Sequence, residues 1–276
     1  MGLTGIILEV KIKLKKVTSS EICQSIYKTK NLKETLEYFE KIKNTPYSVA
    51  WIDCLAKTKN IGRSIFMYGD FLNNQKFDLK KQRKIKIPFF FPNITLNNFS
   101  VKLFNFLYYN FNPHKRDNDI ISYDKFFFPL DSILKWNNIY GSNGFTQYQF
   151  ILPFPFENCY KGLKEILEEI SKSGKGSFLA VLKLYGDENS NYLSFPVKGY
   201  SLALDFKIDR GIFDLLNRLD KIVLRYNGRI YLSKDCRVPK KVFEKGYPEI
   251  GKFRNLRAKY NLKKYINSLQ SLRLDL

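Results

Sequence analysis

Two glutamines stand on one side of a short apolar strand, and their type and spacing could do chemistry. Side chains in a strand alternate between its faces, so Gln147 and Gln149 share one face while Tyr148, Phe150 and Leu152 share the other. One face is apolar, and the other carries groups that donate and accept hydrogen bonds. This pattern is typical of a strand that packs on helices with one side and faces a polar ligand with the other.

The same alternation continues through three further predicted strands, at residues 177–185, 200–206 and 229–233. Their even positions are nearly all apolar, whereas the odd positions include Ser177, Lys183, Ser201, Ala203, Asp205, Arg229, Tyr231 and Ser233, with Lys234 directly after. An antiparallel sheet can simply have one solvated face, and for Gln147 or Lys183 alone that interpretation is favoured. A solvated face would carry more Lys and Glu, so the set as a whole favours a covered polar site.

The elements that position these residues form one repeated pattern of strands and helices. Between the strands lie two predicted helices, at residues 160–172 and 212–225, each with an apolar stripe at helical spacing. The order β-α-β-β-α-β predicts an α+β fold with a ferredoxin-like antiparallel sheet and both helices on one face.

The first half of the chain is less regular. We predict a strand at residues 6–14, a helix at 31–43, strands at 47–53 and 64–68, a buried helix at 101–109 and a polar loop at 110–119. The strand at 6–14 begins abruptly after Gly2 and Gly5. This start indicates that structure belonging upstream is absent from the chain.

Composition limits the classes of function. The chain has 276 residues and a net charge of +21, which points to nucleic acid, an anionic membrane surface or an anionic substrate, although the excess is spread along the whole sequence. Four scattered cysteines and the single His114 argue against a metal site, a disulfide framework or a catalytic triad. The chain has no long apolar run and no signal-peptide pattern, so we expect a cytoplasmic protein, soluble or peripheral at the membrane.

Several stretches, in consecutive order, resemble the FAD-linked oxidoreductases of the vanillyl-alcohol oxidase type, in particular their sugar and D-arabinono-1,4-lactone oxidases. They lie at residues 1–8, 47–53, 101–105, 128–131, 144–150, 177–183, 193–196 and 228–235. The resemblance runs over essentially the whole chain. It departs from the family at residues 260–264, where the usual Asp-Pro is missing.

The resemblance implies a substrate-binding domain that caps a flavin. Residues 1–16 would be the last strand of an otherwise missing FAD-binding domain, residues 17–235 the cap domain, and residues 236–276 a helical segment returning toward the FAD domain. FAD would be held mostly by a domain or subunit encoded upstream. The implied substrate is a sugar, or a sugar carried on a polyprenyl phosphate, and an epimerase or reductase is the implied partner enzyme.

The resemblance also implies roles for individual residues. The catalytic set would be Lys234, Lys183 and Gln149; the substrate-binding set Gln147, Gln149, Lys183, Phe127, Ser201 and Ala203; and the cofactor-binding set Gly2, Gly5, Tyr231 and Lys234. Close relatives have Tyr in place of Phe127, and Asn and Cys in place of Ser201 and Ala203. These departures predict a pocket of different shape.

Two other interpretations stay open. The chain can be an inactive, truncated remnant of such an oxidase. It can also be a basic RNA-binding module, because a ferredoxin-like sheet with exposed aromatic residues can stack bases. The sequence disfavours nucleic acid, since its strand aromatics fall mainly on the even, helix-facing positions and Tyr231 stands alone on the central part of the open face.

Overall fold

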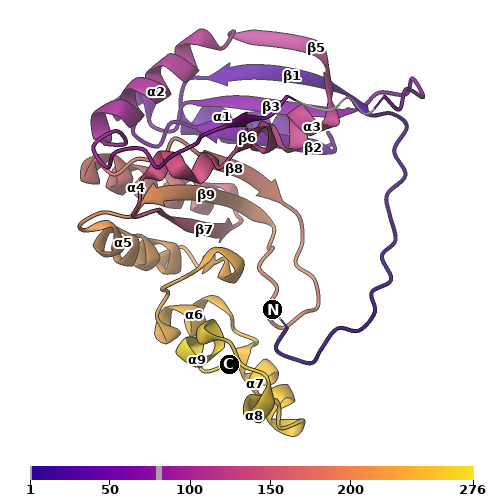
Figure 1. Ribbon diagram of the computed structural model, residues 1–276, viewed down its shortest axis with the longest axis vertical. Coiled ribbons are helices and arrows are strands. Elements are labelled where there is room, and N and C mark those ends of the chain that lie inside the picture. The colour runs from indigo at the N-terminus through magenta and orange to yellow at the C-terminus, as the bar shows by residue number, and fades with distance from the viewer. Residues whose placement is uncertain (1, 79–82) are drawn as a thin grey trace.

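The computed structural model describes residues 2–78 and 83–276, and its described residues form one large antiparallel sheet with helices (Figure 1). Eight strands follow in the order β10-β7-β9-β8-β2-β3-β1-β5. They are β1 (Glu21–Thr29), β2 (Tyr47–Ile52), β3 (Ser64–Phe71), β5 (Lys115–Ser122), β7 (Phe145–Pro153), β8 (Ala180–Tyr185), β9 (Gly199–Lys207) and β10 (Arg229–Ile230). Two short strands, β4 (Ile85–Lys86) and β6 (Ile133–Leu134), form a separate parallel pair. The predicted α+β class and antiparallel sheet are confirmed.

The C-terminal half of the sheet follows the predicted pattern closely. Helix α4 (Phe156–Ser173) ends where Gly174 adopts the left-handed conformation, and α5 (Ile212–Arg225) has the predicted bounds. Both helices cover the apolar even positions, where Phe150, Leu182 and Leu202 are fully buried. One prediction for this half was wrong: β10 ends at Ile230, and Leu232–Lys234 forms a short 3-10 helix instead of continuing the strand.

The N-terminal half contains two strands that the sequence reading missed. Strand β1 lies in the middle of this half and pairs with β3 on one side and β5 on the other. The predicted polar loop at residues 110–119 was wrong, because Lys115–Ser122 is the edge strand β5. The two halves share one strand order. From the centre of the sheet outward, the N-terminal half runs β2, β3, β1, β5 and the C-terminal half runs β8, β9, β7, β10, which in each half is its second, third, first and fourth strand.

The two halves meet along a very short junction. Strands β2 and β8 pair only at Ala50 with Leu182 and at Trp51 with Val181. By contrast, the pairing of β7 with β9 runs the whole length of both strands, from Phe145 to Pro153. The start of β2 is therefore not paired with the end of β8, and the sheet opens there.

Helices lie on both faces of the sheet, so the expectation of helices on one face holds only for α4 and α5. Helix α1 (Leu32–Lys41) lies on the same face as α4 and α5. Helix α2 (Asn98–Phe111) packs on the opposite face, where the ring centroid of its Tyr108 lies 4.7 Å from that of Trp51. Helix α2 was predicted to be buried, and this was wrong: only its Val101 and Asn105 are buried. The short α3 (Tyr123–Phe127) follows β5.

The two ends of the chain lie outside the sheet (Figure 1). Residues 2–17 are extended and pair with no strand among the described residues, and Met1, within the predicted first domain, falls outside them. Four helices, α6 (Lys240–Gly246), α7 (Ile250–Lys259), α8 (Leu262–Tyr265) and α9 (Leu269–Leu274), follow the 3-10 turn. The predicted domain boundaries, and the role of residues 1–16 as a strand of another domain, stay predictions.

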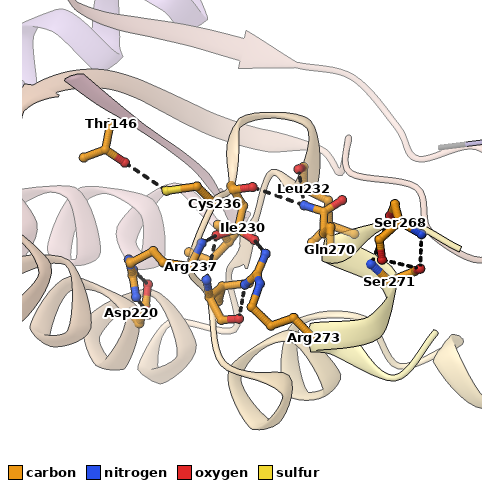
Figure 2. A network of polar contacts seen from close by, with 12 residues as sticks. Thr146, Asp220, Ile230, Leu232, Cys236, Arg237, Ser268, Gln270, Ser271 and Arg273 are labelled. Carbon is orange, nitrogen blue, oxygen red and sulfur yellow. Dashed lines mark hydrogen bonds and ion pairs between the residues drawn. The ribbon is translucent and has the colours of Figure 1, made fainter. Parts of the chain in front are cut away.

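A polar network fixes this C-terminal segment to the sheet and to α5. Arg237 donates hydrogen bonds to both carboxylate oxygens of Asp220 on α5 (Figure 2), and the two nitrogen–oxygen distances are 2.8 and 2.7 Å. Arg273 on α9 makes a 2.7 Å ion pair with Asp235, and the Gln270 amide donates to the carbonyl of Leu232. These contacts hold the chain after β10 in one position against the sheet and α5. No helix in the described part of the chain combines the length and apolar character that crossing a bilayer requires.

Candidate functional site

The predicted polar side chains do meet on one face of the sheet. In the register of β7 with β9, Gln149 stands opposite Ala203 and Gln147 opposite Asp205; in that of β8 with β9, Lys183 stands opposite Ser201. Directly opposed residues in antiparallel strands point to the same face. The face that carries the two glutamines therefore also carries Lys183, Ser201 and Ala203.

Both glutamine amides are held by side chains of the same face. The Gln147 amide donates to the Asp205 carboxylate at 3.1 Å. The Gln149 amide donates to the Ser201 hydroxyl at 3.1 Å and to the Tyr185 hydroxyl at 3.4 Å. These bonds fix the orientation of the two amides before any ligand arrives, as a binding site requires.

Two lysines bring positive charge to this network. Burial, and then the ammonium of Lys234, lower the pKa of Lys183, although the Lys183 side chain keeps contact with solvent. Burial raises the pKa of Asp205, although the hydrogen bond from Gln147 and, to a lesser degree, the charge of Lys234 lower it. Within the described part of the chain, neither ammonium forms an ion pair or a side-chain hydrogen bond. The face therefore carries two neighbouring ammonium groups, with the Asp205 carboxyl near that of Lys234.

The raised pKa of Asp205 predicts a pH-dependent stability. A carboxyl whose pKa rises on folding binds its proton more tightly in the folded state, so it costs stability once it ionises. Relative to Asp205→Asn, the unmodified chain should lose stability as pH rises from about 4, the unfolded value, through the raised folded value. Urea unfolding of both chains at several pH values measures this difference. An Asp187→Asn control, at an exposed position, should track the unmodified chain, and a parallel Asp205→Asn curve would contradict the account.

A groove of about 820 Å³ opens beside this network, where β2 and β8 separate. Its wall includes Trp51, Val181, Lys183, Tyr185 and Phe127. Phe127 packs on Tyr47 with ring centroids 4.9 Å apart, so α3 closes one side of the groove. The groove joins an aromatic wall to the end of the polar network, a combination suited to a ligand with a polar group and an apolar body.

The remaining predicted residues lie at the margins of the site. Tyr231 donates its backbone N–H to the carbonyl of Gln149 at 2.8 Å, and its ring stacks on Phe195 with centroids 4.3 Å apart. Gly2 and Gly5 belong to the extended N-terminal segment. Both have a positive φ, of 62° and 154°, and the space beside each α-carbon is open. The structure brings neither glycine into the polar network.

Sequence reasoning assigned no site role to three residues that shape the site, although it placed Asp205 on the polar face. Asp205 and Tyr185 stand at odd positions of predicted strands, so the alternation of side chains alone could have added them to the predicted site. Trp51 reaches this face only because β2 joins β8, and no local pattern signals that junction. The open face thus carries more aromatic side chains than the sequence reading allowed, but Trp51 and Tyr185 line the walls of the groove.

Comparison with known proteins gives two informative relatives. The chain is 33% identical over 267 residues to the decaprenylphosphoryl-beta-D-ribose oxidase of Mycolicibacterium smegmatis, a match that covers 93% of this chain and 57% of the relative. It is 22% identical over 277 residues to an uncharacterized protein encoded in the mprA 5' region of Streptomyces coelicolor, covering 94% of this chain and 74% of that protein. No family model matches the sequence. The chain spans little more than half the length of the first relative.

Proposed function

Taking as premise that this chain is a relative of decaprenylphosphoryl-β-D-ribose oxidase, an FAD-linked oxidase, we propose that it forms the substrate-binding part of an FAD-dependent oxidoreductase. The proposed reaction oxidises a carbinol of a sugar, or of a sugar linked to a polyprenyl phosphate. Most of the FAD would be held by a further domain or subunit. The strand order β10-β7-β9-β8, with α4 and α5 on one face, supports the inference of a ferredoxin-like cap.

The observation that carries this proposal is the pair of neighbouring lysines, Lys183 and Lys234, on an ordered polar face. Lys183 and Lys234 lie close enough for the charge of Lys234 to lower the pKa of Lys183. Uncompensated like charges are costly unless a ligand offsets them. A ligand that offsets them would be anionic, and the reduced flavin ring, which gains negative charge, is such a group. The donors present therefore suit the proposed cofactor.

Each residue of the face has a task in the proposed reaction. Bound FAD would supply the hydride acceptor. The Lys234 ammonium would stabilise the charge that develops at that acceptor. Lys183 Nζ would hydrogen-bond the carbinol hydroxyl and take up its proton as the hydride leaves, a role that the lowered pKa of Lys183 suits. Gln149, fixed by Ser201 and Tyr185, would hold a neighbouring sugar hydroxyl. The groove lined by Trp51 and Phe127 would exclude water from the apolar side.

The N-terminal segment is the proposed attachment to the FAD-binding part. Leu8, Val10, Ile12 and Leu14 lie on one side of this extended segment, and their side chains are 62–93% exposed. Lys11 and Lys13 alternate with them. An extended segment with this pattern can complete the edge of another sheet, because main-chain hydrogen bonds and an apolar face are both available.

Co-expression with an FAD-binding polypeptide tests the proposal. The chain should co-purify with the flavin-binding portion of the Mycolicibacterium relative, and the complex should retain the visible absorbance of bound flavin. Val10→Asp with Ile12→Asp should abolish co-purification, since charge on the apolar side prevents burial. The matched control, Leu269→Asp with Leu272→Asp at exposed positions of α9, should behave like the unmodified chain. A stable complex that never retains flavin would overturn the proposed function.

A further inference from the structure

Helix α2 turns an apolar stripe outward, away from the sheet that holds it. Phe99, Leu103 and Phe106 follow one another at intervals of four and three residues, which places them along one side of a helix, and Phe111 is the last residue of that helix. Their side chains are 75%, 46%, 54% and 83% exposed. Three large apolar residues in one exposed stripe, together with Phe111 at the end of the helix, form an exposed apolar patch of the kind that marks an interaction site.

The opposite side of α2 is firmly attached, so the outer stripe is not needed to fold the helix. Val101 and Asn105 are buried, and the Asn105 amide donates to the Asp53 carboxylate at 2.8 Å. At the N-terminus, the Asn97 side chain accepts hydrogen bonds from the backbone of Phe99 and Ser100 in a capping box. The stripe is therefore presented on a helix whose position is fixed.

The connection that leads into α2 extends the apolar surface. Phe89, Phe90 and Ile94 are 63%, 57% and 81% exposed. The Asn97 side chain donates to the carbonyl of Ile94 at 2.7 Å, which ties the end of this connection to the start of the helix. Exposed aromatic and aliphatic residues thus continue from the connection onto α2.

The chain segment that forms this surface carries charges of one sign. The sequence contains no Asp or Glu between Asp78 and Asp117. Arg83, Lys84 and Lys86 precede the apolar connection and are exposed, and so is Lys102 on α2. At the C-terminal end of α2, the Lys28 ammonium donates to the carbonyl of Asn110 at 3.2 Å. An apolar surface whose own chain segment carries only cationic side chains is complementary to the surface of an anionic lipid bilayer, which is apolar beneath its headgroups.

We propose that α2 and the connection before it attach this protein to the surface of an anionic lipid bilayer. Phe99, Leu103 and Phe106 would enter the boundary between headgroups and acyl chains, as the apolar side of an interfacial helix does. The exposed lysines and Arg83 would contact the anionic headgroups. Binding to a protein partner would not explain why the chain carries no carboxylate between Asp78 and Asp117. The proposal does not depend on flavin binding.

Vesicle co-sedimentation of the full chain tests this attachment without any flavin. Phosphatidylcholine vesicles that contain phosphatidylglycerol should bind the chain, and added salt or vesicles of phosphatidylcholine alone should reduce binding markedly. The combined Phe99→Ser, Leu103→Ser and Phe106→Ser variant should bind anionic vesicles at least about tenfold more weakly, because three apolar side chains no longer leave water. Tyr265→Ser, Leu269→Ser and Leu272→Ser remove as many exposed apolar side chains elsewhere and should leave binding unchanged.

Other occupants of the stripe would give distinct results. Equal vesicle binding by the α2 variant and the unmodified chain would overturn the proposal, and so would the absence of binding to anionic vesicles. Self-association that disappears in the α2 variant, together with no vesicle binding, would assign the stripe to a second copy of the chain. Circular dichroism of each variant shows whether its fold is intact.

Discussion

Replacing Lys234 with Met in the flavin-containing complex should lower kcat by about 10²- to 10³-fold, the loss typical when one charge-stabilising donor is removed. The reason lies in the position of its ammonium. Lys234 lies close enough to Asp205 and Lys183 to shift the pKa of both, yet it forms no ion pair within the described part of the chain. Its charge is therefore free to stabilise an anionic transition state.

Rapid-mixing measurements of flavin reduction separate this role from a structural one. Lys234→Met should slow the reduction step while the complex keeps its flavin and its unfolding midpoint. Lys234→Arg, which retains the charge, should recover part of the rate. Lys241→Met, at an exposed position on α6, should reduce flavin at the unmodified rate. An unchanged reduction rate in Lys234→Met would remove this residue from the proposed mechanism.

Replacing Asp220 with Ala should destabilise the chain by about 3–5 kcal/mol, the cost of removing one partner from a buried ion pair. Asp220 is 1% exposed and accepts hydrogen bonds from the Tyr148 hydroxyl at 3.0 Å and from both terminal nitrogens of Arg237 (Figure 2). Burial, reinforced by Asp220, raises the pKa of Tyr148 well above its ordinary value, so this phenol stays a donor. Removing the carboxylate leaves a buried guanidinium and a buried hydroxyl without their acceptor.

Urea unfolding monitored by circular dichroism measures this cost. Glu37→Ala, which removes an exposed partner of Lys33 on α1, is the matched control and should change the free energy of unfolding by less than about 1 kcal/mol. A change below about 1 kcal/mol for Asp220→Ala would contradict the buried-pair account. The pair also matters for the site, because Arg237 follows Lys234 by three residues and fixes the chain that carries it.

The C-terminal half of the sheet was predictable because its local patterns agree with its tertiary contacts. Strand β7 contains the predicted strand of the two glutamines, and helix α5 has the predicted bounds, since their period-2 and period-3.6 apolar patterns are strong. The alternation of side chains between the two faces of a strand was enough to place Gln147, Gln149 and Lys183 on one face. The hydrogen bond from Gln147 to Asp205 was not predictable, because it depends on the register of β7 with β9.

The N-terminal half shows where local patterns stop being informative. Strand β5 has the sequence Lys115 to Ser122, which is mostly polar, and it is a strand because β1 offers it an edge. Helix α2 has apolar residues on more than one side, so its sequence could not tell which side would be buried. The groove depends on the two-residue junction of β2 with β8, which is a property of the assembled sheet.

The central claim is that this polar face presents a sugar carbinol to a flavin, and anaerobic spectroscopy of the assembled complex tests it most directly. Adding pentose sugars, free and linked to a polyprenyl phosphate, should bleach the visible absorbance of the oxidised flavin for at least one substrate. The flavin should bleach more slowly in Lys183→Met, because the carbinol hydroxyl loses the group that would take up its proton. A flavin that stays oxidised with every such sugar, yet is reduced by dithionite, would contradict the claim.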